Sequence, residues 1–213
     1  MAYLVKEIFY SLQGEGVNSG RPAVFVRFSG CNLWSGRKED RTGIPCPFCD
    51  TDFVGTDGPD GGRYNNATDV AAAMAQRLPC PPKAGRRSFV VITGGEPALQ
   101  IDTALIDELH SRNWEIAIET NGTLPIPDGM DWITVSPKAG APIVITSGDE
   151  LKLLHPQNGL DPAAFETLNF SHFILQPVDN QFLDENTRLC LDYCLTHPPW
   201  RLGLQMHKVL GIR

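Results

Sequence analysis

Three cysteines, Cys31, Cys46 and Cys49, lie close together in the first quarter of the chain. The last two form a C-x-x-C turn, a spacing that lets two thiolates reach one metal centre. A structural zinc site needs a fourth ligand, and neither Cys80 nor His110 belongs to a second paired motif. A thioredoxin-like redox pair is disfavoured because no helix pattern begins at the second cysteine. Three thiolates suit an iron–sulfur cluster with one iron left open, since such clusters normally take four cysteines. From the cysteines alone, zinc and iron–sulfur both stay open.

Polar or glycine-rich segments follow most of the predicted strands. The segment 94–97 (GGEP), taken alone, is equally well explained as a tight turn that uses glycine for conformational freedom. Parallel sheets place their sites at the carboxyl ends of the strands, so we expect these segments to form one rim. They are GGEP after 93, NGT after 120, PK after 136, QPVDN after 175 and HK after 206.

The elements that must position these groups alternate between short apolar runs and helical patterns. Continuous apolar runs spaced by helices indicate a parallel sheet with covered faces. The sequence predicts strands over 23–29, 89–93, 115–120, 131–136, 150–154, 172–177 and 201–206. It predicts helices over 66–78 with Thr68 as a possible N-cap, over 97–112 with Pro97 in the first turn, over 162–168 and over 184–197. About seven strands are fewer than a complete eightfold barrel needs, so we expect an α/β fold with an open or shortened barrel.

Composition narrows the class of partner. The chain has 213 residues, a net charge of −7 and a pI of about 5.2, without the clustered Lys and Arg of a nucleic-acid surface. A small-molecule substrate is therefore favoured. The interrupted N-terminus is unlike a signal peptide, and no apolar run approaches the ~18 residues of a membrane span. We expect a cytoplasmic protein without membrane contact, whose six cysteines are metal ligands, catalytic groups or buried small residues rather than disulfides.

The cysteine segment resembles the radical S-adenosylmethionine superfamily, which places three cysteines after its first barrel strand with an aromatic residue before the last. Phe48 precedes Cys49 as that pattern requires. The first spacing in this chain differs from the usual C-x3-C-x2-C pattern, because 14 residues separate Cys31 from Cys46. The extra residues, about 32–45, are interpreted as a loop around the cluster, inserted in a single core domain over 1–213. The resemblance implies a partial, open or shortened (β/α) TIM-like barrel.

Further segments are similar to one branch of that superfamily, the ring-contracting lyases of queuosine and deazapurine biosynthesis. They are FYSLQGEG (9–16), RFSGCNL (27–33), ITGGEP (92–97), ETNGT (119–123), SPK (136–138) and QMHKVLG (205–211). This resemblance implies conversion of 6-carboxy-5,6,7,8-tetrahydropterin to 7-carboxy-7-deazaguanine with loss of ammonia. It implies a 4Fe–4S cluster, S-adenosylmethionine whose cleavage starts the reaction at C6, Mg²⁺, an electron donor such as flavodoxin or ferredoxin, and a homodimer.

The resemblance also implies roles for individual residues. Cys31, Cys46 and Cys49 are expected to ligate the cluster, and Thr51 to bind Mg²⁺. The expected contacts to S-adenosylmethionine are Phe48, Cys49, Asp50, Gly94, Gly95, Glu96, Glu119, Ser136, Lys138, Gln176 and Asn180. The expected contacts to substrate are Leu12, Gln13, Gly14, Glu15, Arg27, Thr93 and His207. With the chemistry assigned to the bound cofactor, no side chain is expected to act as a catalytic group.

Plainer explanations remain for several of these residues. Arg27 in an apolar strand is either an edge residue facing solvent or a bidentate partner for a substrate carboxylate. Gln13 and Glu15 either serve a turn or contact the pterin edge, and the rim residues either cap turns or reach ribose or carboxylate groups. Two other functions stay possible at this point, a radical activase for a protein substrate and a zinc-stabilised binding module.

Overall fold

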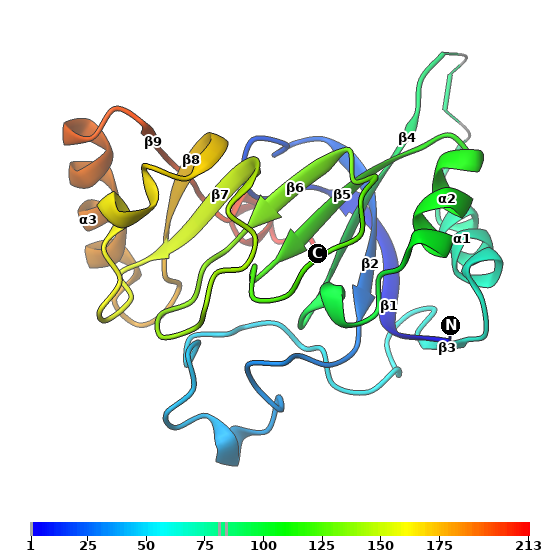
Figure 1. Ribbon diagram of the computed structural model, residues 1–213, viewed down its shortest axis with the longest axis horizontal. Helices are drawn as coiled ribbons and strands as arrows, with labels where there is room; N and C mark the ends of the chain where they lie inside the picture. The colour runs from blue at the N-terminus through cyan, green and yellow to red at the C-terminus, as the bar shows by residue number, and fades with distance from the viewer. Residues whose placement is uncertain (1, 81, 84) are drawn as a thin grey trace.

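The structure, a computed structural model, describes residues 2–80, 82–83 and 85–213. Within those residues one sheet has nine strands in the order β3-β1-β2-β4-β5-β6-β7-β8-β9, drawn as a twisted ribbon in Figure 1. The strands are β1 (Tyr3–Leu12), β2 (Pro22–Phe28), β3 (Gly62–Tyr64), β4 (Ser88–Gly94), β5 (Trp114–Thr120), β6 (Trp132–Val135), β7 (Ser147–His155), β8 (Asn169–Pro177) and β9 (Trp200–Leu202). No helix of the described residues is long and apolar enough to cross a membrane.

The predicted parallel sheet is confirmed. From β2 to β9 every neighbouring pair is parallel, whereas β1 pairs antiparallel with both β2 and β3. Sequence reasoning missed β1, because Lys6 and Glu7 interrupt its apolar pattern, and β3, because it lies at the end of a Gly/Asp-rich stretch. The strand order has two ends, β3 and β9, as an open barrel requires.

The first two predicted helices differ from the observed ones at their starts. Helix α1 (Ala67–Gln76) is capped by Asn66, whose side chain accepts a hydrogen bond from the Asp69 amide, so Thr68 is not the cap. Asparagine provides the acceptor that the first turn needs. The predicted helix 97–112 is divided into a 3-10 turn η2 (Pro97–Leu99) and α2 (Thr103–Ser111), because Asp102 caps the second element.

Two of the later elements are shorter than predicted, whereas β7 and β8 are longer. A 3-10 turn η3 (Pro162–Phe165) replaces the helix expected over 162–168, and α3 (Leu183–Thr196) lies within a residue of its prediction. The last strand ends at Leu202, and the helix α4 (Met206–Leu210) follows it. A further 3-10 turn, η1 (Lys38–Asp40), lies in the cysteine segment.

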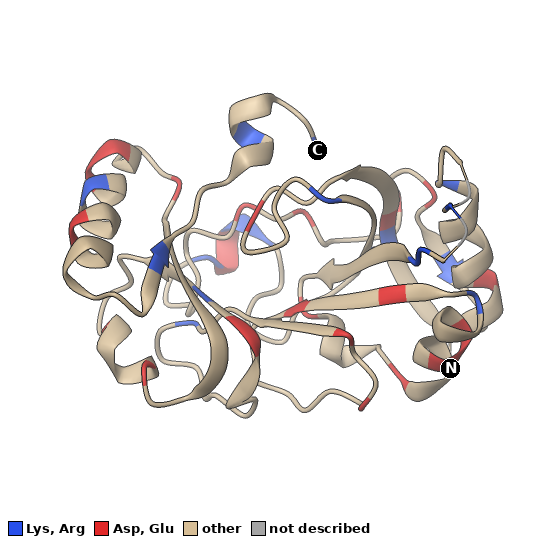
Figure 2. Cartoon of the chain, turned by 90° about the horizontal axis from the view of Figure 1, so that it is seen from above, with Lys and Arg blue, Asp and Glu red and all other residues tan. Residues whose placement is uncertain are grey.

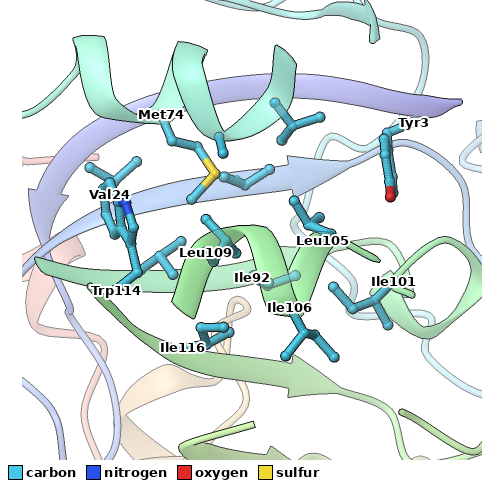
Figure 3. Packing of buried hydrophobic residues seen from close by; sticks show 14 of the residues in the cluster. Tyr3, Val24, Met74, Ile92, Ile101, Leu105, Ile106, Leu109, Trp114 and Ile116 are labelled. Atoms are coloured by element: carbon cyan, nitrogen blue, oxygen red, sulfur yellow. The ribbon is translucent and has the colours of Figure 1, made fainter. Parts of the chain in front are cut away.

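Apolar side chains from alternate strand positions pack under the helices. Helices α1 and α2 lie together over one end of the sheet and α3 lies at the other (Figure 1). Figure 3 shows Met74 of α1 and Leu109 of α2 close to Val24 and Trp114 in the larger core cluster. Full burial of such a side chain stabilises the fold by about 1.5–3 kcal/mol, which fixes the strands that carry the site.

The opposite positions of the same strands face the inside of the curved sheet. Since successive strand residues point to opposite faces, burying Val26, Ile92 and Ile118 under the helices turns Arg27, Thr93 and Glu119 inward. The same alternation on β7 buries Leu151 and Leu153 in the second core cluster and turns Lys152 inward. The fold thus packs one face of the sheet under the helices. The other face carries a smaller apolar cluster that includes Phe25 and Val91, and it holds the cavity toward the carboxyl ends of the strands.

Candidate active site

One cavity of about 380 Å³ lies inside the curved sheet, at the carboxyl ends of the parallel strands. Its wall has a thiol end, with Cys31, Cys46 and Cys49, and a polar end, defined here as Gln13, Glu15, Glu119, Lys152 and Gln205. The residues of the polar end come from β5, β7 and the segments after β1 and β9. The order of strands brings together groups that are up to about 190 residues apart in sequence.

The thiol end lies in the segment between β2 and β3. Cys31 accepts a hydrogen bond from the Leu33 amide at 3.4 Å, and the Cys49 amide donates to the Cys46 carbonyl at 3.1 Å, which closes the C-x-x-C turn. Burial raises the pKa of Cys31, and burial with the neighbouring Cys49 raises the pKa of Cys46 to about 11. These free thiols are therefore protonated near neutral pH, so metal binding must displace protons.

The insertion is tied to the C-x-x-C turn by Arg41. Its guanidinium donates to the carbonyls of Pro47 and Cys49, both at 3.0 Å, and lies 4.6 Å from the ring centre of Trp34. Trp34 in turn donates to the carbonyl of Arg37 at 3.1 Å. The 14 residues between Cys31 and Cys46 thus make a defined loop that supports the turn carrying two thiols.

The GGEP segment lies against the first cysteine. A Cβ on Gly95 would stand 2.3 Å from the carbonyl oxygen of Gly30 and 2.7 Å from Cβ of Cys31, so only glycine fits this approach. Glu96 is fully buried and accepts hydrogen bonds from Thr120 Oγ1 and the Asn121 amide, each at 2.7 Å. Its contacts join the end of β4 to the end of β5 behind the cavity wall.

Two carboxylates and one ammonium dominate the polar end. Nζ of Lys152 lies 2.5 Å from Oε2 of Glu15 and 2.9 Å from Oε2 of Glu119. Gln13 donates to the other oxygen of Glu119 at 2.8 Å, and Gln205 to the other oxygen of Glu15 at 2.9 Å. Burial would raise the pKa of Glu15, but Lys152, Gln205 and His207 outweigh it and bring that pKa to about 2. Both the charge and the orientation of Glu15 are thereby fixed.

A second ionic group lies between β1, β2 and the chain end. Nε of Arg27 donates to Oε1 of Glu7 at 2.9 Å, and Arg213 donates to Oε2 of the same carboxylate at 2.6 Å. All three side chains line the cavity, so Arg27 points inward and is not a solvent-facing edge residue. Glu7 binds Nε of Arg27, and the guanidinium has further donors that suit an anionic ligand.

The C-terminal residues close the cavity from outside the sheet. The Met206 amide donates to the Gly14 carbonyl at 2.8 Å, and Lys208 pairs with both Asp50 and Asp179. In Figure 2 the short helix before the C-terminus lies between the two ends of the molecule, clear of the helices on either side. This segment places His207 in the cavity wall.

Nearly all the residues singled out from the sequence line this one cavity, and two do not. Glu96 lies behind the wall, as described above, and Asn180 accepts hydrogen bonds from the Phe182 amide and Asn186 at the start of α3. Those in the wall are Leu12, Gln13, Gly14, Glu15, Arg27, Cys31, Cys46, Phe48, Cys49, Asp50, Thr51, Thr93, Gly94, Gly95, Glu119, Ser136, Lys138, Gln176 and His207. Gln176 is almost fully buried and its Oε1 has no hydrogen-bond partner within the described residues, so this oxygen is available to a ligand.

Sequence reasoning missed several residues of the wall. Lys152 interrupts the apolar strand pattern ELKLL as Arg27 interrupts AVFVRFS, and that interruption was the available signal. Glu7 carried the same signal within β1. Gln205 begins the resembling segment QMHKVLG (205–211), and that signal was read for His207 alone. Arg213 showed no signal, because only the folded chain brings it to the cavity.

The three thiols at one end of the cavity fit the ligand set of an iron–sulfur cluster. Within the part of the chain that the structure describes, no group of three or more His, Cys, Asp or Glu side chains is placed to hold one ion. A 4Fe–4S cluster instead takes each cysteine on a different iron, so the sulfurs need not converge on one point. Three thiols along one end of a cavity, with a glycine turn packed on the first of them, meet that requirement.

Comparisons with known proteins identify the family. No family model matches the chain. The chain is 56% identical over 213 residues to 7-carboxy-7-deazaguanine synthase of Bradyrhizobium diazoefficiens, with both proteins covered completely. It is 44% identical to the enzyme of that name from Bacteroides thetaiotaomicron, over 98% of each chain. The crystal structure of QueE from Escherichia coli matches 97% of this chain and 95% of its own, with a TM-score of 0.68 and 28% identity. The chain therefore belongs to the 7-carboxy-7-deazaguanine synthase family.

Proposed function

We propose that the cavity of this chain converts 6-carboxy-5,6,7,8-tetrahydropterin to 7-carboxy-7-deazaguanine with loss of ammonia, a step toward queuosine. The observation that carries the proposal is the meeting of three thiols and an ordered polar end in one cavity, in a chain that matches a relative of this family over that relative's whole length. The polar end recognises a compact polar molecule, which favours this substrate over a protein substrate. A zinc-stabilised binding module would not account for the buried ion pairs of Lys152.

The thiol end is proposed to hold the cofactors. Cys31, Cys46 and Cys49 would ligate a 4Fe–4S cluster, and S-adenosylmethionine at the open iron would supply the radical that starts the reaction. Gly95 lies beside Cys31, and Gly94 lies beside Phe28 and lines the cavity, so the backbone of this pair can receive the methionyl end of that molecule. Lys138 is half-buried in the wall next to Cys46, and desolvation lowers its pKa to about 8. Ser136 accepts two hydrogen bonds from Lys138 and orients it.

The remaining wall is proposed to bind the substrate. Arg27 is oriented by Glu7 and has donors suited to the substrate carboxylate. Glu15 and Glu119 are acceptors suited to the N–H groups of the pterin edge, and Gln13 orients Glu119. These groups orient the substrate, and the segment carrying His207 limits access of water to it. Thr51, in the wall beside the thiol end, is proposed to provide an oxygen for Mg²⁺.

The setting of the reaction is part of the proposal. We propose that the whole chain is one core domain with an inserted cluster loop, that it works as a homodimer in the cytoplasm, and that flavodoxin or ferredoxin supplies the electron. The six cysteines are free, which suits a reducing compartment.

Anaerobic purification tests the proposal directly. We expect a brown protein with about four irons and matching sulfide per chain. With dithionite, S-adenosylmethionine and the tetrahydropterin, it should release ammonia and the deazapurine, followed by chromatography and mass spectrometry. A colourless protein that contains zinc, or a brown one that leaves the pterin unchanged, would contradict it.

Cys49→Ala supplies the matched test of the ligand assignment. The variant should lose the cluster and all turnover, whereas Cys190→Ala, at a buried cysteine of α3, should keep its iron. Full iron content in Cys49→Ala would remove this cysteine from the ligand set.

A further inference from the structure

We propose that Lys152 is a positioning residue for the substrate: it holds Glu15 and Glu119 together as two ionised acceptors for the pterin. The inference rests on the proposed function, because it assigns those carboxylates to substrate. Lys152 itself is placed behind them and acts through them.

The geometry shows why one lysine can fix two carboxylates. Lys152 lies on β7 with its side chain turned inward and is 4% exposed. Its Nζ reaches Glu15, which follows β1, at 2.5 Å and Glu119, near the end of β5, at 2.9 Å. Three segments from different parts of the chain therefore meet at one ammonium group. The amides of Gln13 and Gln205 bind the two remaining carboxylate oxygens, so neither carboxylate can rotate without breaking a hydrogen bond.

The charges around Lys152 make its ammonium necessary for that arrangement. Glu150, on the same strand, is 2% exposed, accepts a hydrogen bond from the Val17 amide at 2.6 Å, and has its pKa raised by burial. Glu15, Glu119 and Glu150 thus surround one lysine. Lys138 and His207 are the other cationic or titratable groups that act on this cluster. Without Lys152, two neighbouring carboxylates in a buried site would share a proton, and one of them would titrate at a raised pKa.

Stability alone does not explain this lysine. Replacing a buried ion pair by apolar groups is often neutral or stabilising, so such a pair is weak evidence of a contribution to folding. Here the ion pairs lie in the wall of the cavity and leave Glu15, Glu119 and Lys152 in contact with it. An ionised carboxylate only accepts hydrogen bonds, whereas a protonated one presents a donor. Keeping both groups ionised therefore presents acceptors alone to the N–H groups of a pterin edge.

Substrate binding at several pH values tests the inference. The tetrahydropterin is titrated by calorimetry into the anaerobic, cluster-loaded protein with S-adenosylmethionine and no reductant, so that no turnover occurs. Lys152→Met should weaken binding by at least about 30-fold at neutral pH, the usual consequence of leaving buried charges unpaired. Its affinity should rise with pH as the shared proton is lost, beyond any change in wild type. His207, Lys138 and the substrate are the same in the wild-type and Lys152→Met experiments. The difference between the two pH profiles of binding therefore reports on Lys152.

Three comparisons make the outcome decisive. Lys152→Arg keeps a cation and should restore much of the affinity and the wild-type pH profile. Arg87→Gln removes an ion pair with Asp131 at the amino ends of β4 and β6, away from the cavity, and should bind like wild type. If Lys152→Met does not fold, Lys152→Gln replaces it with the same expectations. A neutral variant with wild-type affinity and pH profile would overturn the inference, whereas absence of binding by wild type would overturn the proposed function instead.

Discussion

The two ends of the cavity are built by different means. The polar end is held by side chains on strands β5 and β7 and on the segments after β1 and β9, joined by four contacts between 2.5 and 2.9 Å. The thiol end lies in the long segment between β2 and β3, where η1 is the one regular element within the described residues. Its order comes from backbone turns and from Arg41.

This difference predicts which property, substrate affinity or iron content, a mutation at each end of the cavity changes first. Strands packed under helices give the polar end precise positions before any ligand arrives, so a change there should alter substrate affinity first. The thiol end depends on close contacts between the cysteine loop and a glycine turn, so a change there should alter iron content first. A substitution that altered iron content and substrate affinity equally would remove the distinction.

Gly95→Ala should have the largest effect and should act on the thiol end. The new Cβ would stand 2.3 Å from the Gly30 carbonyl oxygen, a contact with backbone that no rotamer change relieves. Overpacking of this kind costs about 1–3 kcal/mol, and here the segment that must move carries Cys31. We expect the variant to load much less iron, measured per folded chain after anaerobic reconstitution.

Gly20→Ala is the matched control for that experiment. Gly20 has φ +86, so alanine is strained there, but nothing lies within 4 Å of its Cβ. The control should lose about 1–2 kcal/mol of stability from backbone strain and keep its iron. Equal iron content in the two variants would show that the approach at Gly95 does not matter for loading.

Arg41→Met should have an intermediate effect at the same end. The substitution keeps an apolar stem over Trp34 but removes the donors to the carbonyls of Pro47 and Cys49. Loss of those hydrogen bonds should cost about 1–2 kcal/mol, which corresponds to about 5- to 30-fold faster loss of iron to a chelator. Absorbance of the cluster during chelation provides the rate.

The control for Arg41 is another arginine that bonds a carboxylate on the surface. Arg112→Met removes an ion pair with Glu108 on α2 and should leave the rate of iron loss unchanged. If Arg41→Met lost iron no faster than Arg112→Met, the insertion would contribute nothing to retention of the cluster.

The same contrast explains how much of the site was visible in the sequence. The thiol end was found because its evidence is local: two cysteines in one turn, a third after a strand, and a glycine pair after another. Lys152 was missed as a site residue because its significance depends on Glu15 and Glu119, which are 137 and 33 residues away. Ion pairs between residues that are far apart in the chain leave no recognisable local pattern in the sequence.

The fold shows the same limit. The parallel strands were predicted from apolar runs that are buried on one face and continuous in sequence. β1 was missed because its inward positions include Glu7, which binds Arg27 and Arg213. The helix predicted over 97–112 was too long because Asp102, an N-cap in the middle of the pattern, was not recognised as a start. A functional polar residue in a strand interrupts the hydrophobic pattern that predicts the strand. An N-cap residue inside a helical pattern likewise divides the hydrophobic pattern that predicts the helix.

Asp131→Asn should have the smallest effect on either end of the cavity and should act on stability alone. Asp131 lies at the amino ends of the parallel strands, just before β6, where it pairs with Arg87 and accepts from the Ile116 amide at 2.8 Å. Burial would raise its pKa, but Arg87, the Ile116 amide and His110 outweigh burial and lower it from 3.8 to about 2.

The sign of the pH effect follows from that lowered pKa. A carboxyl group whose pKa is lower in the folded than in the unfolded state stabilises the fold at any pH above its unfolded-state pKa. That contribution is lost as the pH falls through its folded-state pKa. At neutral pH the variant should be less stable by about 1–2 kcal/mol, after allowance for partial exposure. Urea midpoints should show this difference shrinking from about pH 5 toward about pH 2. Iron content and substrate affinity at neutral pH should match wild type, since neither Asp131 nor Arg87, at the amino ends of the strands, lines the cavity. A fall in either would mean that the two ends depend on the whole sheet, and their separate construction would no longer explain how they respond to mutation.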